Sequence, residues 1–152
     1  MINYTRTDAT NTDFKKLVAL LDADLRIRDG DDHAFYAQLN AVAILPYTIV
    51  AYEEGLAVGC GAIKDFEDST VEVKRMYVLP GKRGKGIASG ILQQLEKWAA
   101  ELGYKKCVLE TGMKQPEAIA LYKKSGYHII PNYGKYEGMY NSVCFSKELV
   151  KG

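Results

Sequence analysis

A basic, glycine-rich turn lies near the middle of the chain, between a strand-like segment and a long amphipathic segment. The stretch from Val71 to Ser89 reads VEVKRMYVLPGKRGKGIAS. A helix that begins directly after such a turn presents several unpaired backbone N–H groups, and its dipole attracts negative charge to the same place. These residue types predict a binding site for a phosphate-bearing ligand.

The spacing inside the turn supports this prediction. Gly86 follows Arg83 by three residues, and the small residue Ala88 comes two residues later. Glycine lets the backbone approach an oxyanion closely, and a small residue keeps the first helical turn clear. The hexapeptide alone also fits a loop that merely begins a helix, because short glycine motifs occur by chance. It matches neither the GxxxxGK[ST] phosphate loop nor the GxGxxG dinucleotide motif.

Two residues of opposite charge stand on the strand that leads to this turn. Glu72 places a carboxylate near the predicted phosphate site, so binding and chemistry can share one place. Lys74 shares the strand face of Glu72, and an ammonium so close would make the carboxylate a weaker base. The same alternation places Arg75 with Val73 and Tyr77 on the other face.

Apolar periodicity predicts the elements that position these residues. Apolar residues recur at helical spacing from Ile87 to Leu102, and Gly103 ends that helix. Similar signals predict helices near residues 14–25, 34–40 and 116–125. Alternating or β-branched segments bounded by turn residues predict strands, at residues 2–6, 48–52, 57–64, 70–78, 106–111, 127–130 and 143–147.

The order of these elements predicts an α+β fold with a mixed, mostly antiparallel sheet. About six to seven strands and about four flanking helices are expected. Strand 70–78, helix 87–102 and strand 106–111 form a crossover unit, which makes these two strands parallel. The 152 residues are expected to form a single domain, 1–152.

Composition narrows the class of protein. Twenty basic and nineteen acidic residues give a net charge of +1, which argues against a nucleic-acid binder. We find neither an apolar signal segment at the N-terminus nor an apolar run near the ~20 residues that span a bilayer. The separated cysteines Cys60, Cys107 and Cys144 are expected to be reduced core residues, and metal-ligand spacing is absent. We therefore expect a cytoplasmic protein without a metal site.

A second motif follows the turn, and together the two resemble a known family. The turn reads R-x-x-G-x-A from Arg83, and the segment from Gln115 to Tyr127 reads QPEAIALYKKSGY. They resemble [QR]-x-x-G-x-[GA] and N-x-x-A-x-x-L-Y-x-x-x-G-[FY], the signatures of the GNAT family of acetyl-CoA-dependent N-acetyltransferases. The order of elements also agrees, so the resemblance covers essentially the whole chain and is strongest from Val71 to Tyr127.

The resemblance implies acetyl-CoA as the co-substrate. The pyrophosphate would rest on the amides of the turn, and the pantetheine arm would pair like an extra strand beside the end of strand 70–78, where an amide would polarise the acetyl carbonyl. Gln115 replaces the asparagine that the family often carries near the CoA arm; it keeps the amide and is one methylene longer. The implied cofactor-binding residues are Met76, Val78, Arg83, Gly84, Lys85, Gly86, Ala88, Ser89 and Gln115.

The resemblance also implies two catalytic residues. Tyr122 matches the tyrosine that protonates the departing CoA thiolate, a role that suits a phenol with a pKa of ~10. A tyrosine of the core is the alternative. Glu72 lies where some family members carry a glutamate that accepts the proton of the amine, whereas a structural Glu72–Lys74 ion pair explains the same residues equally well.

The acceptor side of the site is less defined. We expect a primary amine on a small molecule, or alternatively an amine of a protein. The loop from Asn132 to Asn141 carries three tyrosines and could line the acceptor pocket, form a homodimer interface or be a surface hairpin. Leu25 to Tyr36 is the other expected wall. A CoA-binding sensor with little catalysis would need neither Tyr122 nor Glu72, so their presence favours an enzyme. A nucleotide-binding protein is a third hypothesis, which predicts thermal protection by ATP or NAD.

Overall fold

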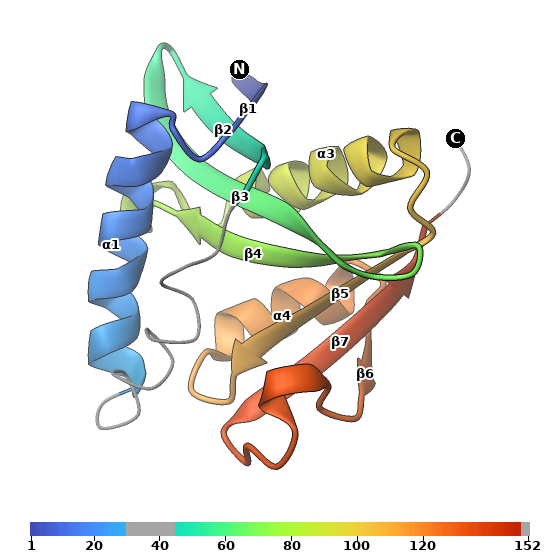
Figure 1. Cartoon of the computed structure of the whole chain (residues 1–152). Coiled ribbons are helices and arrows are strands. Elements are labelled where there is room, and N and C mark those ends of the chain that lie inside the picture. The colour runs from blue at the N-terminus through green and yellow to red at the C-terminus, as the bar shows by residue number, and fades with distance from the viewer. Residues whose placement is uncertain (30–44, 150–152) are drawn as a thin grey trace.

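A seven-stranded sheet forms the centre of the protein. The computed structural model describes residues 1–29 and 45–149 (Figure 1). The strands are β1 Ile2–Thr7, β2 Tyr47–Glu53, β3 Leu56–Glu67, β4 Thr70–Val78, β5 Lys106–Gly112, β6 His128–Ile130 and β7 Ser142–Glu148. Their order is β1-β2-β3-β4-β5-β7-β6, with β4 and β5 parallel and the other neighbours antiparallel. The predicted α+β class with a mixed, mostly antiparallel sheet is confirmed.

Three α-helices of the described residues cover the two faces of this sheet. They are α1 Thr12–Asp29, α3 Ile87–Glu101 and α4 Pro116–Lys124. Phe14, Leu17 and Leu21 of α1 pack on one face, whereas the apolar stripe of α3 and Tyr122 of α4 belong to the core on the other face. The short helix expected at residues 34–40 lies outside the described residues.

Local sequence explains where these helices begin. The Asn11 side chain accepts a 2.9 Å hydrogen bond from the Phe14 N–H, which caps the start of α1. Gly86 precedes α3 in the left-handed conformation (φ 83°), which favours glycine. Pro116 occupies the first turn of α4, where its missing N–H costs no helical hydrogen bond.

The parallel strands β4 and β5 separate soon after they begin. They pair only over Thr70–Glu72 and Lys106–Val108. Beyond Glu72 the two strands diverge, and Figure 1 shows the gap widening toward α1, while β5 stays paired with β7. The backbone edge of the second half of β4 is therefore not covered by β5.

A bulge in β4 changes which side chains face α1. The β3–β4 register shifts between Cys60 and Ala62, so two residues of β4 oppose one residue of β3, and Arg75 takes a positive φ of 59°. Val73 packs into the core beneath α3, but Tyr77 packs on the α1 side. The prediction that Val73 and Tyr77 share a face is wrong, because it assumed unbroken alternation.

Candidate active site

A long cleft runs from the basic turn along the uncovered end of β4 to α4. Ala118, Leu121 and Tyr122 form its α4 wall. The lining also includes eight of the implied cofactor-binding residues, which are Met76, Val78, Arg83, Gly84, Gly86, Ala88, Ser89 and Gln115. Lys85 is exposed in the turn and does not line this cleft. The fold thus brings two sequence motifs together, although binding itself stays a prediction.

The turn is fixed against β4 by one side chain. The Nε–H of Arg83 donates a 2.9 Å hydrogen bond to the Val78 carbonyl, and its guanidinium lies 5.4 Å from the ring centroid of Tyr77. Gly84 and Gly86 have φ angles of 77° and 83°, a conformation that side-chain-bearing residues rarely adopt. The start of α3 is therefore presented to the cleft by a turn of defined shape.

The edge of β4 faces this cleft at Val78. The Leu79 N–H donates to the Val58 carbonyl of β3 at 2.9 Å. Because successive residues of an antiparallel strand direct their backbone groups to opposite edges, the groups of Val78 point away from β3, to the side that β5 has left. The Arg83 bond to the Val78 carbonyl agrees with this direction. This edge can accept an extended ligand as an added strand.

A smaller cleft adjoins the long one on the side of α1. The two clefts share Met76, Gln115 and Tyr122 among their lining residues. The smaller cleft is also lined by charged side chains of β4 and β5, which are Glu72, Lys74, Arg75 and Glu110. Tyr122 therefore stands where the two clefts meet, and we call the smaller one the acceptor cleft.

Glu72 has two partners inside the fold. It is 5% exposed, and its Oε2 accepts a 2.7 Å hydrogen bond from the hydroxyl of Tyr133. The Nζ of Lys74 lies 3.6 Å from its Oε1, which confirms that Lys74 shares its face. Burial lowers the pKa of Lys74 to about 8, although the Glu72 carboxylate opposes this shift. The Glu72–Lys74 ion pair that the sequence suggested is therefore present. Glu72 also lines the acceptor cleft, which a catalytic base must do.

Tyr122 belongs to both the core and the clefts. Its ring centroid lies 5.9 Å from that of Tyr127 and 5.8 Å from that of Phe145. Burial raises its pKa above the ordinary value of 10, and the nearby Glu110 carboxylate raises it further. The phenol therefore keeps its proton at neutral pH, as an acid that protonates a leaving group must.

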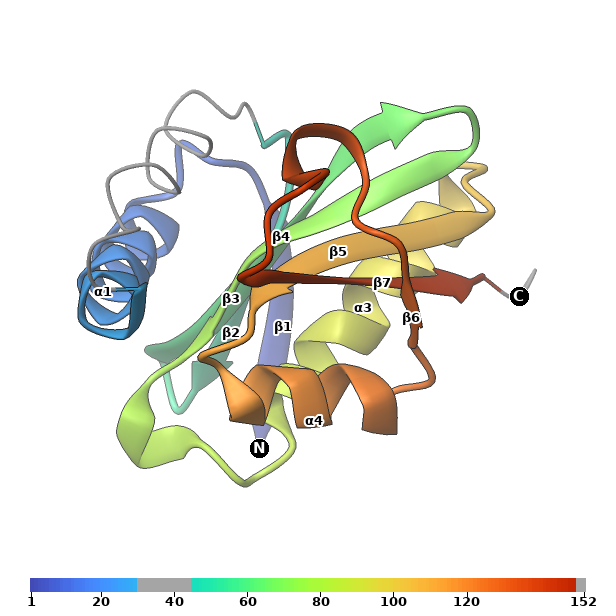
Figure 2. The same ribbon diagram turned by 90° about the horizontal axis from the view of Figure 1, so that it is seen from below.

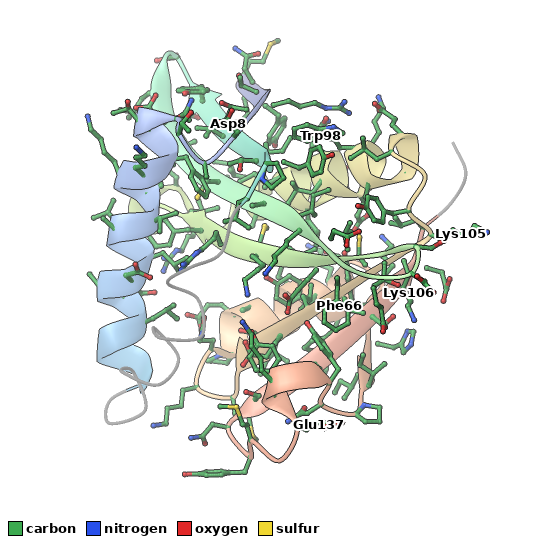
Figure 3. The ribbon with its side chains drawn as sticks, in the orientation of Figure 1. Asp8, Phe66, Trp98, Lys105, Lys106 and Glu137 are labelled. Atoms are coloured by element: carbon green, nitrogen blue, oxygen red, sulfur yellow. The ribbon has the colours of Figure 1, made fainter. Side chains whose placement is uncertain are left out.

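The loop from Asn132 to Asn141, which carries Tyr133, Tyr136 and Tyr140, lies on the acceptor side of the sheet. Figure 2 shows this loop, between β6 and β7, on the opposite side of β5 and β7 from α4. The ring centroid of Tyr133 lies 4.9 Å from that of Phe66 and 5.6 Å from that of Tyr136, both in edge-on contact, and Tyr136 lines the acceptor cleft. Figure 3 labels Phe66, near the end of β3. Tyr140 is 82% exposed. Two of the three tyrosines thus belong to the acceptor side, which the sequence had left open.

Glu110 and Arg75, two further charged side chains of the acceptor cleft, have partners within the fold. Glu110 accepts a 2.7 Å hydrogen bond from Ser142, and Arg75 pairs with Asp22 of α1 at 3.3 Å. Leu25, at the beginning of the second expected wall, lines the cleft. The side chains of residues 26–36 lie outside the described part of the chain. The sequence does not show which of these side chains pair, because the partners Ser142 and Asp22 lie on other elements of the fold.

The cysteines are buried free thiols. Burial raises the pKa of Cys60 to about 12 and that of Cys144 to about 11, so neither is a thiolate at neutral pH. Within residues 1–29 and 45–149, His, Cys, Asp and Glu form no group of three or more suited to a metal ion. The helices in the same ranges are all too short or too polar to cross a membrane.

Comparison with known proteins relates this geometry to a family. Residues 14–127 match the model of the acetyltransferase (GNAT) family. An IAA acetyltransferase of Azospirillum brasilense is 43% identical over 89 residues, which are 58% of this chain and 58% of that protein. The match thus spans less than two thirds of that relative.

Solved structures extend the likeness over the whole fold. A Klebsiella pneumoniae protein, assigned as an acyl-CoA N-acyltransferase, is 31% identical with a TM-score of 0.83, and the match covers 99% of each chain. A GNAT acetyltransferase of Elizabethkingia anophelis, solved with acetyl-CoA bound, has the same fold at 19% identity, with a TM-score of 0.69 over 97% of this chain and 98% of that one. The predicted family is therefore confirmed, and the chain belongs to the acetyltransferase (GNAT) family.

Proposed function

We propose that this protein transfers the acetyl group of acetyl-CoA directly to a primary amine. The observation that carries the proposal is the position of Tyr122, where the long cleft of the turn meets the acceptor cleft of Glu72. Two clefts that meet at one buried acid allow both substrates to be present together. The acetyl-CoA bound to the related GNAT structure supports the choice of acyl donor.

The turn residues would hold the donor. Backbone N–H groups at the start of α3, shaped by Gly84 and Gly86, suit the pyrophosphate, and Ser89 can add a hydroxyl. The edge of β4 at Met76 and Val78 suits the pantetheine arm, and an amide there would stabilise negative charge on the acetyl oxygen. Lys85 would contribute screened charge attraction from the exposed side of the turn.

The two catalytic side chains would move protons on either side of the transfer. Glu72 accepts the proton that the amine must lose before its nitrogen can attack the acetyl carbon. As the new C–N bond forms and the C–S bond breaks, Tyr122 donates its proton to the sulfur, and the second proton that leaves the acetylated nitrogen restores the Tyr122 phenol. Tyr133 and Lys74 hold the Glu72 carboxylate in place through the contacts described above.

A small-molecule amine fits this site better than a protein amine, because the acceptor cleft is the smaller cleft and has buried walls at Lys74 and Tyr136. The three free thiols agree with a reducing, cytoplasmic location. Homodimer formation stays a prediction, and the exposed Tyr140 is available for it.

A screen of thiol release from acetyl-CoA tests the proposal across amino acids, polyamines, aminoglycosides and peptides. Release that depends on both enzyme and amine is expected. Tight acetyl-CoA binding without release from any amine would instead support the sensor hypothesis. Thermal protection by ATP or NAD, with none by CoA, would support a nucleotide-binding protein.

A further inference from the structure

Lys74 is a buried ammonium group with little compensation from the protein. Its side chain is 5% exposed and lines the acceptor cleft. Its ion-pair partner, Glu72, lies 3.6 Å from Nζ, which is too long for a hydrogen bond. Among the described residues, Lys74 Nζ makes no hydrogen bond to a side chain or carbonyl. Three N–H donors thus face a cleft without an acceptor from residues 1–29 or 45–149.

A buried cation in this state is costly, and the surrounding charges increase the cost. Transfer of an ammonium from water is unfavourable unless hydrogen bonds and an opposite charge replace its hydration. Glu72 is the anion that stabilises the Lys74 charge, whereas Lys135, Arg75 and Lys64 all repel it. The side of the cleft around Lys74 therefore favours an additional negative group.

The Glu72 carboxylate stands beside this ammonium, so the cleft presents one negative and one positive group close together. Glu72 suits the amine of the acceptor, and Lys74 suits an anion adjacent to that amine. The 3.6 Å between the two side chains matches an acceptor whose two charged groups are attached to a single carbon. A carboxylate would supply the acceptor atoms that Lys74 lacks.

We propose that Lys74 binds the carboxylate of the acceptor, and that the acceptor is a small molecule with a carboxylate next to its amine, as in a free α-amino acid. This inference rests on the proposed acetyltransferase function and deepens it. The acetyl group then passes to the α-amine, the thiol of CoA is released, and the carboxylate remains bound to Lys74 without reacting.

A set of matched acceptors tests the role of the carboxylate separately from the proposed acetyl transfer to a primary amine. The probes are the common L-amino acids, the primary amide of each and the corresponding amine without the carboxylate, all assayed by thiol release. The amide keeps the shape of the acid but removes its charge. Because an amide also lowers the basicity of the α-amine, more of the amide is present in the reactive neutral form. A preference for the acid therefore cannot result from a larger fraction of neutral α-amine.

We expect kcat/KM for the best acid to exceed that of its amide by about tenfold or more, which corresponds to ~1.4 kcal/mol. In Lys74→Met, the acid should lose its advantage over the amide, chiefly through KM, so that the ratio of their kcat/KM values falls to about one. Any loss that comes from the Glu72 contact affects both acceptors equally and leaves this ratio unchanged. Lys74→Gln provides a second neutral variant if Lys74→Met does not fold. Lys105→Met is the charge control, because Lys105 is exposed at the far side of the molecule from α1 (Figure 3).

Four results would overturn the inference. If the wild-type enzyme used the amide or the simple amine as well as the acid, this inference would be wrong, but the proposed acetyltransferase function would stand. An equal loss for acid and amide in Lys74→Met, or an acetyl group on Lys74 itself, would give Lys74 a different role. Absence of release from every amine would reject the proposed function, and this inference with it.

Discussion

The hydroxyl of Tyr133 donates a 2.7 Å hydrogen bond to the carboxylate of Glu72, across 61 positions of sequence. We expect Tyr133→Phe to lower kcat by about tenfold, because a hydrogen bond to a charged group is worth ~1.5–3 kcal/mol and here orients the carboxylate. The affinity for acetyl-CoA, measured by calorimetry, should stay the same. Tyr140→Phe is the control, since Tyr140 is exposed. A change in acetyl-CoA affinity with normal kcat would contradict the assignment.

Tyr122→Phe should reduce turnover by well over tenfold while acetyl-CoA still binds. The substitution removes the proton that the leaving thiolate requires, and general acid catalysis contributes about 10²–10⁴-fold. Tyr127→Phe is the matched control, because Tyr127 is also buried but donates to Glu96 at 2.9 Å. It should lose stability and keep activity. Normal turnover in Tyr122→Phe would remove this residue from the mechanism.

Glu72→Gln should lower kcat/KM and remove the acidic limb of the pH–rate profile. The amide cannot accept a proton, so activity should no longer depend on that ionisation. Glu67→Gln, at the exposed end of β3, controls for the loss of one negative charge. A normal rate with an unchanged acidic limb would leave Glu72 and Lys74 as a purely structural pair.

Gly86→Ala should weaken acetyl-CoA binding by about tenfold. Gly86 has a φ of 83°, and open space surrounds the position of an added Cβ. The left-handed conformation costs other residues ~1–2 kcal/mol, so the turn should shift away from the shape that binds the pyrophosphate. Gly81→Ala is the control, because Gly81 also has open space but no positive φ. Equal affinities of the two variants would show that the shape of the turn does not decide binding.

The pKa of Lys74 predicts how stability depends on pH. Burial lowers this pKa from 10.5 to about 8, so between these values the unfolded chain binds more protons than the folded protein. The free energy of unfolding should therefore rise with pH in this window, by up to ~3 kcal/mol from this group. Below pH 8 the full cost of the buried charge is present.

Urea unfolding of wild type and Lys74→Met at pH 7 to 9.5 isolates this contribution. Wild type should gain stability relative to the variant as the pH rises. The range stops below pH 10, since the raised pKa of Tyr133 and Tyr122 opposes the gain there. A constant difference between the two proteins would mean that Lys74 keeps its ordinary pKa in the fold.

Local pattern was sufficient to predict much of the fold. The helix that begins at Ile87 and the strand from Thr70 to Val78 have strong periodicities and clear end signals, and both lie where expected. Family resemblance then placed Tyr122 and the turn at one cleft. These predictions depend on periodicity and motifs within short segments, and both can be identified directly in the sequence.

The acceptor side could not be predicted in the same way. The bulge at Arg75 depends on how β4 pairs with β3, and it reverses the faces of the residues that follow. Asp22 and Arg75 are 53 positions apart, and their ion pair forms only once α1 has packed on the sheet. Alternation along one strand contains no information about either contact.

Direct transfer at the junction of the two clefts is the central claim, and the fate of the acetyl group tests it most directly. Enzyme, acetyl-CoA and the best amine from the screen should be mixed, and the acetylated amine, free CoA and intact protein measured by mass spectrometry. We predict equal amounts of acetylated amine and CoA, no release without amine, and a protein of unchanged mass. An acetylated protein, or acetyl-CoA that binds and is never consumed, would contradict the claim.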